Sequence, residues 1–347
     1  MAAGQDPTST EDRALEEPLS PPRDAAEPAP PLPAPVEPPP PPAPRPRFHP
    51  LVRSALFLVA YLVVQVVLGV AIALFAQAAG GDLFKEGGFT SSSEIQLLGI
   101  VLAAPFVVAM TFVFVWALDR RPIGSLGARW PEGGPRKALV QAVTAPLATL
   151  ALLGSWLAVI LLLPATLAEV GFGGVSGSFE TGPAWWPLAP SLLLGLLLLG
   201  FLIQGGLEEW IVRGYIYRAL KDRWRPWVAA LASSVLFALM HLLNPDVSAV
   251  ALGNIVIAGM ILAALVEKSG SLWSATLAHG VWNFAVACLL SVPVSGVRMF
   301  HLFDVSIGGR ELVTGGLFGP EGSLVLTALG LLLTAWLWRG LPARVRE

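Results

Sequence analysis

Long apolar runs with almost no charge recur along the chain, and they limit it to a membrane-spanning fold. A helix needs about 20 apolar residues to cross the hydrocarbon core, with a range of about 17–25. We interpret eight segments as spans: 51–78, 95–118, 138–164, 188–212, 226–243, 248–266, 271–290 and 323–338. Charged residues make up only 13% of the chain, against roughly 25% in soluble domains. The sequence therefore predicts an all-α polytopic membrane protein with about eight transmembrane helices.

Positive charges are distributed unevenly between the two sides of the predicted membrane. Arginine and lysine gather before the first span and after the second, fourth, sixth and eighth spans. The opposite loops carry only Lys85, Arg298 and Arg310. Because cytoplasmic loops of membrane proteins are enriched in Lys and Arg, both termini are expected in the cytoplasm.

Composition divides the chain into two regions. The first 47 residues hold 16 of the 31 prolines and have no apolar run that could form a core, so residues 1–48 are predicted to be a disordered, Pro-rich cytoplasmic tail. Residues 49–347 are the predicted transmembrane domain. Cys288 is the sole cysteine, which excludes an intrachain disulfide.

A small set of ionisable and amide side chains interrupts the apolar runs. Charged groups at membrane depth are costly and need partners. Counted from the cytoplasmic ends of their spans at 1.5 Å per residue, these groups fall at depths of about 12 to 22 Å. The helices can therefore bring them together in an intramembrane polar site. They are Glu208, Glu209 and Arg213 in the fourth span, His241 in the fifth, and His279 and Asn283 in the seventh.

Helical spacing favours particular pairs within this set. Glu209 and Arg213 are four residues apart and share a helix face, as do His279 and Asn283. Glu208 and Glu209 point about 100° apart. We expect Glu208 to face the cluster and Glu209 to pair with Arg213, although the sequence leaves the reverse assignment open.

The residue types in this set indicate chemistry on water. A carboxylate can take a proton from water, a histidine can hold that water or bind a metal, and an amide can stabilise an oxyanion. A purely structural polar network is the alternative. The remaining histidines, His49 and His301, fall outside the spans and are expected to be solvated.

Three short motifs carry these residues, in the order "EEWIVR" at 208–213, "FALMH" at 237–241 and "HGVWN" at 279–283. Together they resemble the signature of the CPBP family, also called Abi or CAAX-protease-like intramembrane proteases, which includes the type II CAAX prenyl endopeptidases. The resemblance covers about residues 95–290. It implies an eight-helix endopeptidase whose site lies inside the membrane, opens toward the cytoplasm, and acts on membrane-associated proteins or peptides, prenylated CAAX-type substrates among them.

The resemblance also implies a role for each residue of the motifs. Glu208 would be the general base and His241 would position the hydrolytic water, His279 and Asn283 would hold the oxyanion, and Glu209 and Arg213 would support the site.

Zinc is the alternative to an unaided carboxylate. Glu208, His241 and His279 could supply the three protein ligands of a catalytic zinc, but a metal-bound His279 would leave the oxyanion to Asn283 alone. The chain also lacks two histidines at i, i+4 flanking a glutamate on one helix. We therefore favour a glutamate-type enzyme without a cofactor and keep a metallo-type enzyme as the alternative.

Two other functions compete with a protease. A transporter also uses intramembrane carboxylates, but usually with broken helices or repeats, and neither is evident. A non-catalytic scaffold or immunity-type interaction protein could keep the motifs as structural contacts. The expected partners are the lipid bilayer and a membrane-associated protein or peptide substrate, with no nucleic acid.

Overall fold

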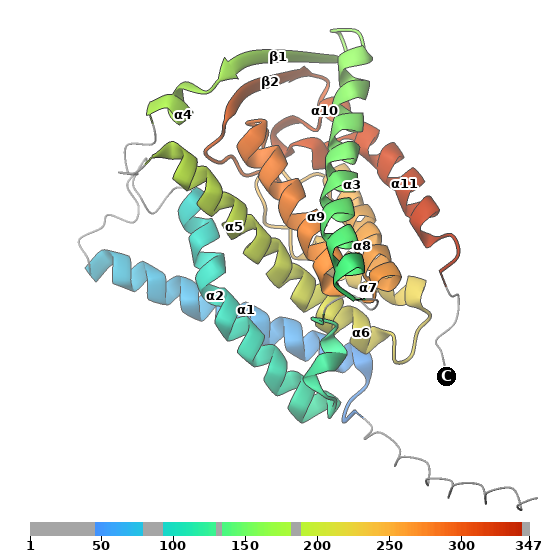
Figure 1. Cartoon of the computed structure of the whole chain (residues 1–347). Coiled ribbons are helices and arrows are strands. Elements are labelled where there is room, and N and C mark those ends of the chain that lie inside the picture. The colour runs from blue at the N-terminus through green and yellow to red at the C-terminus, as the bar shows by residue number, and fades with distance from the viewer. Residues whose placement is uncertain (1–45, 79–92, 130–133, 182–188, 342–347) are drawn as a thin grey trace, which may run out of the picture. The chain divides into compact units, whose positions relative to one another are not determined.

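Helices account for most of the computed structural model, which describes residues 46–78, 93–129, 134–181 and 189–341 (Figure 1). The predicted tail up to residue 45, Lys85 and the last six residues lie outside the described residues. Every predicted span contains a helix, so the all-α polytopic class is confirmed. The eight helices are α1 (Pro50–Ala78), α2 (Ser93–Phe114), α3 (Gly134–Leu162), α5 (Pro190–Glu209), α7 (Pro226–Leu239), α8 (Ala249–Ser269), α9 (Leu272–Phe284) and α11 (Leu324–Trp338).

Six of the described helical segments are long and apolar enough to cross a membrane. The other two predicted spans, α7 and α11, have 14 and 15 residues. The predicted span 226–243 is wrong at its carboxy-terminal end. Helix α7 ends at Leu239, and His241 lies in the following turn.

Three of the helices continue with wider, π-helical turns. These segments are Val115–Asp119 after α2, Trp210–Ile216 after α5, and Ala285–Leu289 after α9. Helix α6 (Tyr217–Leu220) completes the α5 span. The segment after α5 begins inside the first motif, and the segment after α9 begins two residues after the third motif. Such π-helical turns often mark functional sites.

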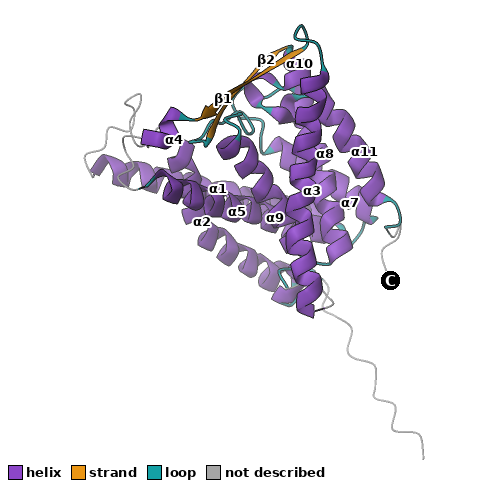
Figure 2. Cartoon of the chain, turned by 45° about the horizontal axis from the view of Figure 1, so that its top comes forward, coloured by secondary structure: helices purple, strands orange, loops and turns teal. Residues whose placement is uncertain are grey.

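A two-stranded antiparallel sheet, which the sequence analysis did not predict, joins two loops. Strand β1 (Ala168–Val175) follows α3, and β2 (Phe303–Gly309) lies between α9 and α11. The register pairs Ala168 with Gly309 and Val175 with Phe303. Figure 2 shows the strands crossing the same end of the helices as the short helices α4 (Gly177–Thr181) and α10 (Glu311–Thr314). The loops after the third and seventh predicted spans were expected on the same side of the membrane, and the sheet joins them.

Ionic contacts join three other helix ends. Arg53 at the start of α1 bonds to Asp119 after α2 and, at 2.7 Å, to Asp222 after α6. Arg121 binds the second oxygen of Asp222, also at 2.7 Å. All three ends belong to the side predicted to be cytoplasmic.

Helices α5 and α9 lie side by side and approach each other closely (Figure 1). A Cβ atom placed on Gly280 would lie 2.8 Å from the Cα atom of Leu202, and one on Gly205 would lie 3.0 Å from the backbone nitrogen of Gly280. Small residues allow membrane helices to approach in this way. The contact brings the acidic end of α5 next to His279 on α9.

Candidate active site

The imidazole ring of His279 lies between the two adjacent glutamates. Its Nδ1 atom is 3.0 Å from Glu209 Oε1, within hydrogen-bond distance. Its Nε2 atom is 3.6 Å from Glu208 Oε2, which is too long for a hydrogen bond. Because an ionised carboxylate can only accept, the hydrogen of this pair sits on Nδ1. The orientation of the ring is thus fixed by Glu209, and its Nε2 atom is directed toward Glu208.

Glu209 is fully buried together with Arg213, and their side chains form an ion pair at 2.9 Å. The guanidinium carbon of Arg213 also lies 4.9 Å from the centre of the Phe237 ring. The expected pairing of Glu209 with Arg213 is therefore present. The division of tasks is not exclusive, because the Glu209 oxygen that binds Arg213 also accepts from His279.

Gln204 connects Asn283 to Glu208, and the sequence analysis did not identify it. Its Oε1 atom accepts from Asn283 Nδ2 at 3.0 Å, and its Nε2 atom donates to Glu208 Oε1. Gln204 is the one polar side chain in the run 192–207, and it stands four residues before Glu208. Both facts were visible in the sequence, and the spacing of four places Gln204 on the same helix face as Glu208.

His241 is placed by Phe237 rather than by the glutamates. Its Nδ1 atom is 2.9 Å from the Phe237 carbonyl oxygen. The ring of Phe237 lies edge-on to both histidines, with centroid distances of 4.7 Å to His241 and 5.9 Å to His279. The structure therefore connects five of the six predicted residues, directly or through Gln204: Glu208, Glu209, Arg213, His279 and Asn283. The sixth, His241, is separated from His279 by the ring of Phe237.

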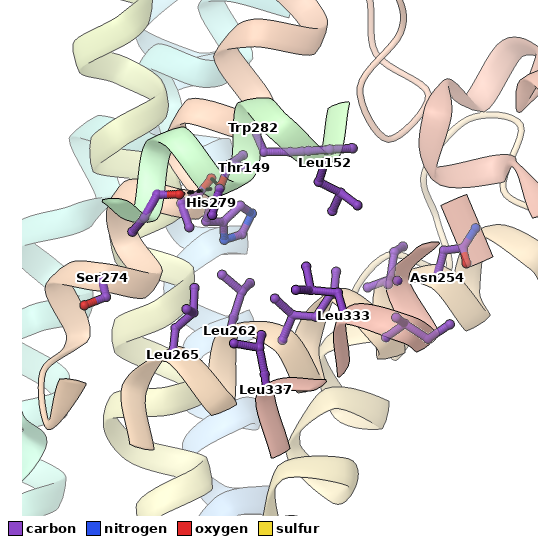
Figure 3. A pocket seen from close by; sticks show the side chains of 18 of the residues that line it. Thr149, Leu152, Asn254, Leu262, Leu265, Ser274, His279, Trp282, Leu333 and Leu337 are labelled. Carbon is purple, nitrogen blue, oxygen red and sulfur yellow. Dashed lines mark hydrogen bonds between the residues drawn. The ribbon is translucent and has the colours of Figure 1, made fainter. Parts of the chain in front are cut away.

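A cavity of about 380 Å³ adjoins this cluster. Phe237, His241, His279 and Asn283 line it, whereas the two glutamates are not among its lining residues. Figure 3 shows the His279 ring directed into the cavity, opposite the aliphatic side chains of α8 and α11. An apolar cavity with a few convergent polar groups is typical of a ligand or substrate site.

The geometry does not fit the three-ligand zinc site. Among the described residues, no three His, Cys, Asp or Glu side chains are grouped so that they could hold a metal ion. Glu208 and His279 approach each other, but His241 does not join them in a group of three. No step of the mechanism below passes through a metal.

Fold and site together define an integral membrane protein that holds a connected group of ionisable side chains among its helices. Residues 190–285 match the Rce1-like family, described as type II CAAX prenyl endopeptidase Rce1-like. The match begins at the first residue of α5 and contains all three motifs. This part of the chain is therefore similar to the type II CAAX prenyl endopeptidases, and the resemblance found in the sequence is confirmed over residues 190–285. No curated protein matches the chain.

Proposed function

We propose that the protein is an intramembrane endopeptidase that hydrolyses a peptide bond of a membrane-associated substrate with water activated by Glu208. The observation that supports this best is the placement of His279 between two carboxylates of different environment. Glu209 is completely buried and bound to Arg213, whereas the side chain of Glu208 keeps 16% exposure. Prenylated CAAX-type proteins are one substrate class that the family suggests.

Glu208 is the residue suited to accept the proton from water. Gln204 binds its Oε1 atom, while its Oε2 atom has no hydrogen-bond partner among the described residues. In the proposed reaction this oxygen takes a proton as the water oxygen bonds to the substrate carbonyl carbon. The same proton then passes to the amine as the carbon–nitrogen bond breaks.

His279 and Asn283 are suited to stabilise the oxyanion that forms in between. Glu209 holds the Nδ1 side of His279, which leaves Nε2 for a second hydrogen. Asn283 uses one amide hydrogen on Gln204 and retains the other. Two such donors one helical turn apart can bind one developing negative charge. His241, across Phe237, would position the water.

The orientation in the membrane and the domain limits complete the proposal. We propose that both termini are cytoplasmic, that residues 1–48 form a tail, and that residues 49–347 form one transmembrane domain. The contacts of Arg53, Arg121 and Asp222 support this orientation, because they gather helix ends that carry cytoplasmic-type charge.

Glu208→Gln tests the proposal, because glutamine keeps the size of the side chain and cannot take a proton from water. We expect carboxy-terminal fragments generated by the wild-type protein to disappear from cells that express this variant, with turnover lowered by about 10²–10⁴-fold. Glu267→Gln is the matched control, since Glu267 pairs with Lys221 away from the cluster, and it should cleave normally. Unchanged fragments in the Glu208→Gln cells would favour a non-catalytic scaffold.

A further inference from the structure

An acidic side chain outside the three motifs, Glu321, lines the cavity. It belongs to the short turn Pro320–Gly322, directly before α11, and lies beyond the segment that matches the family. The residue is 8% exposed. It lines the same cavity as His279 and Trp282, and the proposed mechanism gives it no role.

Neighbouring donors fix the position of Glu321. The indole nitrogen of Trp282 donates to Oε1 at 2.7 Å, and the backbone nitrogen of Ser295 donates to Oε2 at 3.4 Å. The amide of Asn254 holds the backbone carbonyl of Glu321 at 2.8 Å. The carboxyl group is thus held in place at the cavity wall rather than free to turn away.

No lysine or arginine of the described part of the chain forms an ion pair with Glu321. A buried carboxylate without a cation is costly, and burial raises the pKa of Glu321, although the hydrogen bond from Trp282 and the nearby His279 act in the opposite direction. A positive charge brought in by a ligand would remove this cost, because the buried acid would then have a partner.

Most of the rest of the cavity is suited to an aliphatic group, although Lys268 at the end of α8 also lines it. Leu262, Leu265, Leu333 and Leu337 form one side of it, with Leu152 and Trp282 opposite (Figure 3). The Trp282 indole ring can also contact a cation through its face. Trp282 is three residues beyond His279, a rise of about 4.5 Å along α9. A cation bound to Glu321 would therefore lie about one helical turn from the candidate active site.

We propose that Glu321 binds an ammonium or guanidinium group of a ligand whose aliphatic part fills this cavity. On the basis of the peptidase function proposed above, that ligand is a Lys or Arg side chain of the substrate, close to the bond that is cleaved. Glu321 is then a specificity-determining residue, because a neutral side chain of the same length would leave the buried acid unpaired.

Binding of two matched probes to the full-length protein in nanodiscs of uncharged lipid tests this without any need for activity. Decylamine and decanol share a chain and differ in the charged head. We expect the wild-type protein to prefer decylamine by about tenfold or more, as for a buried charge pair, measured by calorimetry. Glu321→Gln keeps an oxygen for Trp282 and should abolish the preference. Equal binding of both probes, or a preference that survives in Glu321→Gln, would overturn the proposal.

Glu311→Gln is the matched control for this measurement. Glu311 is exposed on α10 and does not line the cavity, so this variant removes a nearby charge and should keep the preference for decylamine. A loss of preference in Glu311→Gln would mean that the charge of the whole surface, and not Glu321, selects the amine, and it would contradict the proposal.

A peptide library then separates this inference from the proposed function. Cleavage by Glu208→Gln sets the background, so wild-type cleavage no higher than this background would refute the peptidase function. If the wild-type protein cleaves, its products should be enriched in Lys or Arg near the new ends, and Glu321→Gln should cleave without that enrichment. An unchanged profile in Glu321→Gln would refute the role of Glu321 and leave the peptidase function intact.

Discussion

Glu208 and Glu209 are neighbours in sequence with different surroundings. Glu209 accepts hydrogen bonds from Arg213 and His279 on one oxygen and is shielded from solvent. Glu208 is bound by an uncharged amide and its side chain keeps 16% exposure, while each of the two acids has one oxygen without a partner among the described residues. In the proposed mechanism the two acids have separate tasks: Glu209 holds the histidine and Glu208 takes the proton from water.

Arg213→Met should destabilise the protein strongly, because it leaves Glu209 buried without its cation. Breaking one side of a buried ion pair costs about 3–5 kcal/mol. Thermal unfolding in detergent measures the effect. The double variant Glu209→Gln/Arg213→Met should recover much of the lost stability while remaining inactive. A single variant as stable as the wild-type protein would show that the ion pair is not needed for the fold.

Zinc content separates two chemistries on the same side chains. Because the described residues offer no group of three metal ligands, we expect purified protein to carry less than one zinc per chain. A chelator-treated sample should keep its peptidase activity. Elemental analysis showing one zinc per chain, with activity lost on its removal and restored on its return, would place Glu208, His241 and His279 around a metal instead.

At the scale of elements, the site depends on the close contact between α5 and α9. Gly280→Ala would place a methyl group 2.8 Å from the Cα atom of Leu202, and backbone atoms cannot yield as a flexible side chain can. We expect a loss of about 1–3 kcal/mol in stability and a larger loss of activity, because His279 moves with the helix. Unfolding and turnover measured on one preparation give both values.

Gly195→Ala is the control for that change. Gly195 lies on α5 with nothing within 4 Å of an added Cβ atom. The substitution should leave activity unchanged and slightly stabilise the helix, since alanine is the better helix former. Equal losses in Gly195→Ala and Gly280→Ala would show that the loss does not come from the close contact between α5 and α9.

Sequence patterns predicted the helices well, because a run of apolar residues in a membrane has few alternatives to a helix. They failed where contacts between distant segments decide the structure. The sheet pairs a glycine-rich stretch, "AEVGFGGV", with residues far along the chain, and neither strand alternates clearly. The end of α7 before His241 is likewise invisible in an apolar run that continues to Leu243.

The candidate site was predictable in its members and only partly in its contacts. The motifs identified six residues, and helical spacing correctly paired Glu209 with Arg213. Spacing along one helix does not give the rotation of its neighbour, so the contact of His279 with both acids required the structure. Glu321 lay in a predicted loop and had no pattern to distinguish it from a solvated acid.

For the whole molecule, orientation in the membrane is the property most open to test. Reporter fusions after residue 347 and within the loop 291–322 should report opposite sides, the first in the cytoplasm. The reason is that most of the positive charges of the loops lie on the same side of the membrane as the reporter after residue 347. A further reporter between α3 and α5 should agree with the one in the loop, because β1 and β2 pair. Agreement between the residue-347 and loop reporters would contradict the orientation and the count of eight spans.

The pairing of β1 with β2 also sets an order of events during synthesis. Strand β1 precedes α5, and β2 follows α9, so roughly 130 residues must be made after β1 before its partner exists. At about 5–20 residues per second, β1 waits for roughly 7 to 26 s. During that time its edge has no partner, while the helices that form the candidate site are still being made. The sheet therefore closes only after the helices with the three motifs have emerged, and its formation is a late step in assembly.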